Sequence, residues 1–132
     1  MKIDHLGIAV KAVADAAKMY EQVLGLKVSS MDQVEEQGVR VAMLDIGESS
    51  LELLEATRPD SPIGKFVAKR GEGLHHIAVQ VDNIEAALAQ LKASGVRLID
   101  EAPRKGAHNT RVAFIHPAGT HGVLLELVEH AK

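Results

Sequence analysis

The chain has 132 residues, of which 46% are hydrophobic and 25% are charged, and its net charge is −3 at pH 7. These values are typical of one folded domain and exclude a disordered or fibrous protein. The negative charge, the scarcity of aromatic residues and the lack of a long apolar run argue against nucleic-acid and membrane partners, and the absence of cysteine excludes disulfides and thiolate chemistry.

The first half of the chain reads as one strand, one helix and three strands. Residues 3–10 alternate and are rich in Ile and Val, which predicts a strand. Apolar residues then recur at helical spacing over residues 13–24, and Gly25 is placed to end that helix in a left-handed cap. We expect three further strands near residues 26–31, 39–46 and 50–56, with a turn at Gly47.

A connecting segment, residues 58–73, follows. Ser61 and Pro62 look like an N-cap and a proline at the first helical position, so we expect a short helix that ends at Gly71.

The second half repeats the first. An offset of 71 residues places His5 on His76, and an offset of 74 residues places Glu52 on Glu126, with apolar positions matched around both. The repeat predicts a strand at 75–81, a helix from residue 84 to Gly95 and strands near 96–100, 110–115 and 122–129. Asp82 or Asn83 would cap this helix, with Glu85 completing a capping box.

The predicted fold class is therefore α+β, with two tandem βαβββ modules in a single domain over residues 1–132. Module 1 covers about residues 1–57, the connecting segment about 58–73, and module 2 about 74–132.

The repeat pairs one histidine and one glutamate in each half. If the modules pack about a pseudo-twofold axis, His5, Glu52, His76 and Glu126 converge, and two imidazoles with two carboxylates suit a divalent first-row metal. Each glutamate also interrupts an apolar strand, where burial of a lone carboxylate is costly unless a metal or hydrogen bonds compensate.

The alternative is that these side chains have structural or surface roles. Strand alternation alone would let Glu52 and Glu126 face water, as we expect of Glu55 and Glu129. The joint placement under the repeat favours the metal site.

The other histidines are weaker candidates. His75 adjoins His76 on a strand and therefore points to the opposite face. His108 lies on a predicted loop, where it could contact a substrate, and His116 is expected to make a backbone hydrogen bond in a turn. His121 and His130 are assigned to solvent.

The chain resembles the vicinal oxygen chelate superfamily (glyoxalases, bleomycin resistance proteins and dioxygenases) and, within it, the methylmalonyl-CoA epimerase family. The resemblance runs from Ile3 to Val128, and its most specific motifs combine Leu-His-His-Ile, His-Pro and Gly-Val-Leu-Leu-Glu-Leu. These stretches are residues 74–77, 116–117 and 122–127.

The resemblance implies a cupped mixed sheet around one metal held by His5, Glu52, His76 and Glu126. Co²⁺ is the expected ion, with Ni²⁺, Zn²⁺, Mn²⁺ and Mg²⁺ as alternatives. Some family members carry a glutamate, assigned as a base, where this chain has Val41. Our hypothesis is that Glu52 supplies that second carboxylate, with metal-bound water as the alternative.

The implied reaction interconverts (R)- and (S)-methylmalonyl-CoA by proton transfer at the α-carbon through a metal-stabilised enolate, with Glu126 and Glu52 as catalytic groups. Lys105, His108, Asn109 and Thr110 are weaker candidates for contacts with this acyl-CoA thioester. Cations available for the coenzyme phosphates are Lys65, Lys69, Arg70, Arg104, Lys105 and Arg111.

Three other functions stay open. They are a glyoxalase I-type isomerase or lyase acting on a glutathione hemithioacetal, a ring-cleaving dioxygenase, and a non-enzymatic small-molecule-binding protein of the same fold. The family expectation is a homodimer, and the simplest location is cytoplasmic. The sequence leaves open the native metal and whether the modules pair within one chain or between chains.

Overall fold

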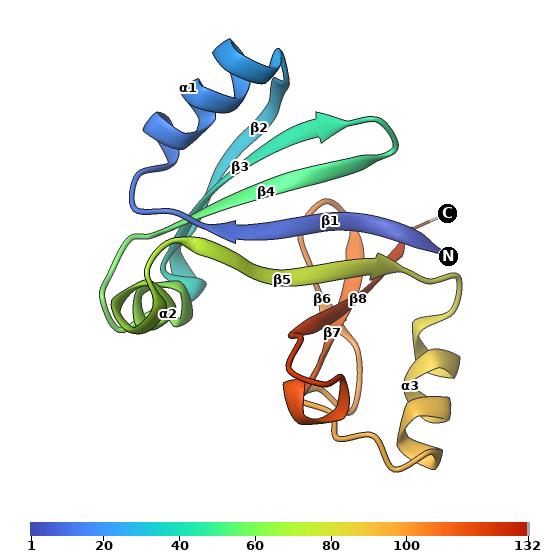
Figure 1. The fold of residues 1–132 in the computed structure, drawn as a ribbon. Helices are drawn as coiled ribbons and strands as arrows, with labels where there is room; N and C mark the ends of the chain where they lie inside the picture. The colour runs from blue at the N-terminus through green and yellow to red at the C-terminus, as the bar shows by residue number, and fades with distance from the viewer. Residues whose placement is uncertain (132) are drawn as a thin grey trace. The chain divides into compact units, whose positions relative to one another are not determined.

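The computed structural model describes residues 1–131, and the chain divides into two compact units. We call residues 5–75 the N-terminal unit, and residues 1–4 together with those from His76 onward the C-terminal unit. In the order of the chain, the elements are β1 Lys2–Ala9, α1 Val13–Leu24, β2 Lys27–Val34, η1 Glu35–Gln37, β3 Val39–Ile46, β4 Ser49–Ala56, α2 Pro62–Arg70, β5 Gly73–Gln80, α3 Ile84–Ala93, β6 Arg104–Lys105, β7 Thr110–Ile115, η2 Pro117–Gly119 and β8 Leu125–His130 (Figure 1).

The predicted α+β class and the strand-helix-three-strand order of both halves are confirmed. No helix among the described residues is long and apolar enough to cross a membrane.

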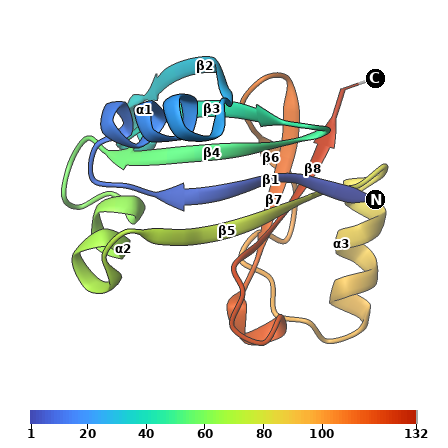
Figure 2. The same ribbon diagram turned by 45° about the horizontal axis from the view of Figure 1, so that its top comes forward.

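The N-terminal unit carries strands in the order β2-β3-β4-β1, with β1 parallel to β4 and the other pairs antiparallel. Figure 2 shows α1 lying across this sheet, and a buried cluster that includes Val13, Leu44 and Leu53 fills the space between them. The helix α2 packs through Ile63 against Leu54 of β4. Since Leu54 and Glu52 lie two residues apart on one strand, α2 lies on the face of β4 that bears Glu52.

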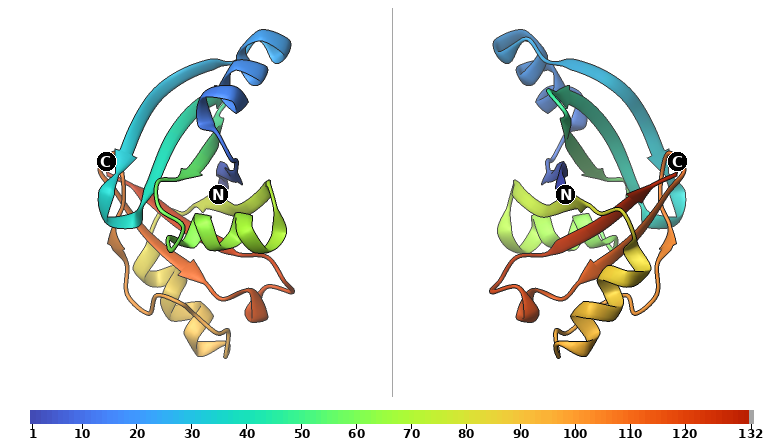
Figure 3. Two further views of the ribbon diagram at one scale, coloured as in Figure 1. Left: turned by 90° about the vertical axis from the view of Figure 1, so that its left-hand side faces the viewer. Right: turned by 90° about the vertical axis from the view of Figure 1, so that its right-hand side faces the viewer.

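The C-terminal unit repeats this arrangement with the order β5-β8-β7-β6, in which β5 is parallel to β8. The helix α3 contacts β7 and β8, as Figure 3 also shows, and covers a core that includes Ile84, Ile115 and Leu127. Glu126 precedes Leu127 on β8, so it points away from α3.

Most predicted turns and caps match the structure. Gly25 ends α1 with φ of +71°, and the Ser61 hydroxyl oxygen accepts a hydrogen bond of 3.1 Å from the Gly64 amide at the start of α2. The prediction of a capping box at α3 was right about a side-chain cap but wrong about Glu85. The cap is Asn83, whose side chain accepts from the Ala86 amide at 3.0 Å, and Glu85 pairs instead with Arg111 at 2.8 Å.

The prediction of a strand near residues 96–100 was wrong. Only one bridge, Leu98 to Ile115, forms there, and the edge strand is β6 at Arg104–Lys105. The amides of Ile99 and Asp100 both donate to the Phe114 carbonyl, while the Asp100 carboxylate accepts the Phe114 amide at 2.8 Å. A side chain thus replaces the backbone partner, which interrupts the ladder at this point.

Glu55 and Glu129 were expected to face solvent, and that expectation was wrong. Glu55 accepts from the Val13 amide at 2.7 Å, and Glu129 accepts from the Ile84 amide at 3.0 Å. These amides belong to the first residues of α1 and α3. Each glutamate also pairs with an arginine of the adjacent strand, Arg40 or Arg111, at 2.8 Å. In both units a strand carboxylate therefore anchors the start of the covering helix.

Candidate metal centre

The N-terminal unit brings His5 of β1 next to Glu52 of β4. Their Nε2 and Oε1 atoms lie 3.6 Å apart, and the side chains are 8% and 20% exposed. A separation of 3.6 Å is too long for a hydrogen bond, although it allows an electrostatic contact. The parallel register sets Gly7 opposite Glu52.

The C-terminal unit holds the equivalent pair more deeply. Nε2 of His76 on β5 lies 3.1 Å from Oε1 of Glu126 on β8, with the side chains 5% and 9% exposed. The His76 ring meets the Phe114 ring edge to face, at a centroid separation of 5.7 Å. The register sets Ala78 opposite Glu126.

On β1 and β5 the residues opposite the two glutamates are therefore small, whereas β3 and β7 place Met43 and Phe114 opposite them. Gly7 and Ala78 are 71 positions apart, the same offset that relates the two histidines. A larger side chain at either position would cover the carboxylate, because residues directly opposite on neighbouring strands lie about 5 Å apart.

The distance within each pair fits two neighbouring ligands of a metal ion. Bonds of about 2.0–2.2 Å from a divalent ion to nitrogen and oxygen, at angles of about 90–109°, separate adjacent ligand atoms by about 2.8–3.6 Å. The measured 3.1 Å and 3.6 Å both fall within that range. Each unit thus supplies one imidazole nitrogen and one carboxylate oxygen, a donor type that suits first-row divalent ions.

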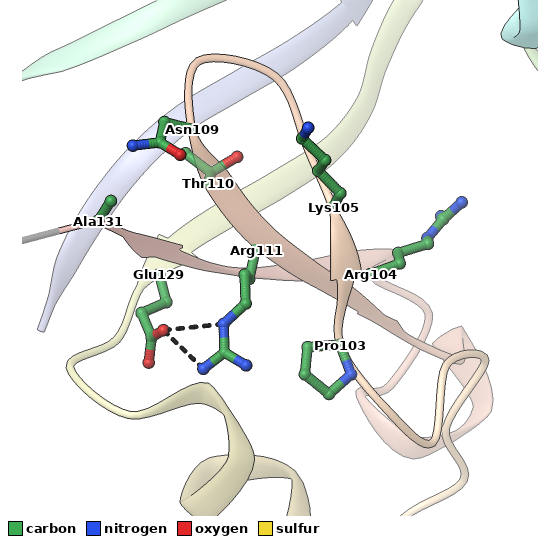
Figure 4. A pocket seen from close by; sticks show the side chains of 8 residues that line it. All are labelled: Pro103, Arg104, Lys105, Asn109, Thr110, Arg111, Glu129 and Ala131. Atoms are coloured by element: carbon green, nitrogen blue, oxygen red, sulfur yellow. Dashed lines mark hydrogen bonds and ion pairs between the residues drawn. The ribbon is translucent and has the colours of Figure 1, made fainter.

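Three of the four weaker substrate candidates line one hollow in the C-terminal unit. Lys105, Asn109 and Thr110 border a cavity of about 510 Å³, shown in Figure 4. The other lining residues are Pro103, Arg104, Arg111, Glu129 and Ala131. His108 does not line this hollow, and it lies on the loop before β7 with φ of +54°.

Two residues of the hollow are already engaged with the protein. The Thr110 hydroxyl donates to the Ala107 carbonyl at 2.6 Å. Arg111 donates to Glu129 through two nitrogens, as the dashed lines in Figure 4 show, and also contacts Glu85. Hydrogen bonds to Glu129 and then to Glu85 raise the pKa of the Arg111 guanidinium above its ordinary value. These contacts leave Thr110 and Arg111 with structural roles.

The remaining histidines lie largely as expected. His75 packs against Phe66 of α2, with ring centroids 5.0 Å apart. The His116 Nδ1 atom accepts the Ala118 amide at 3.0 Å, which confirms its turn role, and His121 is exposed. His130 is exposed as expected, and its Nε2 atom lies 2.5 Å from Oδ1 of Asp4.

Comparison with known proteins gives consistent matches. The family model of the glyoxalase/bleomycin resistance protein/dioxygenase superfamily matches residues 4–114. The chain is 46% identical to the uncharacterized protein YqjC of Bacillus subtilis, over 97% of the chain and 91% of that protein. It is 40% identical to the mitochondrial methylmalonyl-CoA epimerase of Homo sapiens, over 96% of the chain and 72% of that protein. A solved methylmalonyl-CoA epimerase in complex with methylmalonyl-CoA and NH₄⁺ is 43% identical, with a TM-score of 0.91 over 98% of the chain and 94% of that structure.

Proposed function

The chain belongs to the glyoxalase/bleomycin resistance protein/dioxygenase superfamily and, within it, to the methylmalonyl-CoA epimerase family, and from this premise we propose that it interconverts (R)- and (S)-methylmalonyl-CoA. The observation that supports the proposal most directly is the pairing of one histidine with one glutamate in each unit, at 3.6 Å and 3.1 Å.

The proposal assigns one divalent ion to His5, Glu52, His76 and Glu126, with Co²⁺ as the expected ion. The superfamily and the donor set support it, since two imidazoles and two carboxylates match the preference of such ions. A bound divalent ion would supply positive charge that stabilises the negative charge developing on the thioester oxygen.

The two glutamates carry the proton transfers in this proposal. One carboxylate removes the α-proton of the substrate, so the C–H bond breaks and the proton passes to that carboxylate oxygen. The other carboxylate gives a proton to the opposite face of the same carbon, which inverts it. The burial of Glu126 supports its role, because a carboxylate shielded from water transfers a proton without first losing a hydration shell.

Deuterium exchange tests the reaction directly. The metal-loaded protein is incubated with (S)-methylmalonyl-CoA in D₂O, and we expect the (R) form to accumulate with deuterium at the α-carbon, detected by NMR. A glutathione hemithioacetal serves as the comparison substrate. Conversion of the hemithioacetal without α-exchange in the thioester would reject the epimerase in favour of the glyoxalase-type reaction.

Metal analysis tests the ligand assignment separately from activity. We expect about one divalent ion per chain in the wild-type protein and a loss of most of it in His5→Ala and His76→Ala, because each change removes one coordinate bond. His121→Ala, at an exposed position, is the matched control. Unchanged metal content in both ligand variants would refute the assignment.

The proposal includes a homodimer, which the family resemblance supports, and a cytoplasmic location, which the lack of cysteine supports. Sedimentation of the purified protein tests the dimer, and fractionation of the producing cells tests the location.

A further inference from the structure

Arg104 lies on the same face of the C-terminal sheet as Glu126. In β6 it is paired with Val112 of β7, and Phe114, two residues further along β7, is paired with Glu126. Residues opposite each other, and residues two apart on one strand, share a face of the sheet. The register therefore places Arg104 on the face of the sheet that bears Glu126, the proposed proton-transfer group.

Ring contacts place the guanidinium close to the site. Its central carbon lies 5.5 Å from the centroid of the Phe114 ring, and that ring lies 5.7 Å from the ring of His76. The two separations together limit the distance from the guanidinium carbon to the His76 ring to about 11 Å. A cation over an aromatic face is held without using its hydrogen-bond donors.

Asp100 lies beside this side chain. Nε of Arg104 lies 3.4 Å from Oδ2 of Asp100, and the same oxygen accepts the Phe114 amide. The Arg104 side chain makes no hydrogen bond to residues 1–131, and it is 51% exposed. The paired donors at the end of the guanidinium are thus available to a ligand.

Neighbouring cations do not share this position. Lys105 is paired with Arg111, so it points to the face opposite Glu126. Arg111 lies on that face as well, with its charge opposed by Glu129 and Glu85. Among residues 1–131, three cations border the hollow, and of these Arg104 alone lies on the Glu126 face.

We infer that Arg104 binds an oxyanion of the acyl-CoA thioester, a carboxylate or a phosphate, while the acyl carbon lies at Glu126. The inference rests on the proposed function for the identity of the ligand. A guanidinium fork matches two oxygens of either group. The guanidinium carbon lies at most about 11 Å from the ring of His76, and Nε2 of that ring lies 3.1 Å from Glu126, so one acyl-CoA can contact both Arg104 and the His76–Glu126 pair.

Calorimetric titration of the metal-loaded protein with malonyl-CoA tests the inference. We expect Arg104→Gln to raise Kd about tenfold or more, because a charge-assisted contact is lost, and Arg104→Lys to restore part of the affinity. Lys105→Gln is the matched control, one residue away on the other face, and we expect its Kd to stay within about twofold of wild type.

Propionyl-CoA, which lacks the free carboxylate, distinguishes the two sources of the oxyanion. If Arg104→Gln loses affinity for malonyl-CoA but not for propionyl-CoA, Arg104 binds the carboxylate. If it loses affinity for both thioesters to a similar extent, Arg104 binds the coenzyme phosphates. Unchanged affinity of Arg104→Gln for malonyl-CoA, or an equal loss in Lys105→Gln, would overturn the inference.

The same variants separate this result from the proposed reaction. Thermal unfolding checks that Arg104→Gln is folded, and α-exchange by the wild-type protein is measured independently. Wild-type epimerisation with no effect of Arg104 on binding rejects only the role of Arg104. Binding that depends on Arg104, in a wild-type protein without epimerisation, rejects only the reaction.

Discussion

At the scale of single residues, the two glutamates differ in burial although the repeat makes them equivalent. Glu126 is 9% exposed and lies 3.1 Å from its histidine, while Glu52 is 20% exposed and lies 3.6 Å from its own. Val41 lies on the same face as Glu52, since it is paired with Leu54, and it offers no carboxylate. Glu52 is therefore the carboxylate that the N-terminal unit offers on this face of β4 for the second proton transfer.

This division of roles predicts one-sided exchange. Glu126→Gln should lose inversion by a factor of about 10² or more and still exchange the α-proton of one epimer with solvent, because the remaining carboxylate serves a single face. Glu52→Gln should exchange the α-proton of the other epimer with solvent. NMR of each pure epimer in D₂O measures this, with a protein-free sample as control. Full inversion in Glu126→Gln would remove that residue from the mechanism.

At the scale of elements, a strand carboxylate starts each covering helix. Ala12, the residue before α1, makes no side-chain cap, and Glu55 fills that role from β4. At α3, Glu129 of β8 accepts the Ile84 amide in addition to the Asn83 cap. Because each carboxylate also meets an arginine, one side chain connects a helix and two strands.

Removing this anchor should destabilise the fold. We expect Glu129→Gln and Glu55→Gln each to lower the free energy of unfolding by about 1–3 kcal/mol, since a charged acceptor for a helix-start amide and an arginine is lost. Urea unfolding measures the change. Glu85→Gln is the control, because Glu85 is largely exposed and, within residues 1–131, pairs only with Arg111, so its effect should stay below about 1 kcal/mol. Equal effects at all three positions would contradict the anchoring role.

At the scale of the whole molecule, metal binding should couple to stability. An ion that binds the folded chain and not the unfolded one stabilises it by mass action, by about 2.7 kcal/mol at a hundredfold excess over Kd. We expect Co²⁺ to raise the Tm of the wild-type protein and EDTA to reverse the rise. His76→Ala should show no such rise. If Co²⁺ leaves the Tm of the wild-type protein unchanged, the folded protein does not bind this ion.

The duplication is the feature that the sequence determines best. Matched histidines and glutamates, the helical spacing in each half and the Ser61-Pro62 helix start are local patterns, and local geometry sets them. The order of elements therefore followed from the residues themselves.

Contacts between distant residues were decided only by the tertiary structure. Glu55 and Glu129 look like solvent-facing positions of a strand, but their partners Val13 and Ile84 lie 42 and 45 residues away. Asp100 likewise breaks the expected strand because folding brings the Phe114 amide to it. Such pairings depend on which elements pack together, and the alternation of one segment carries no information about them, because a buried polar group takes whichever partner the packing supplies.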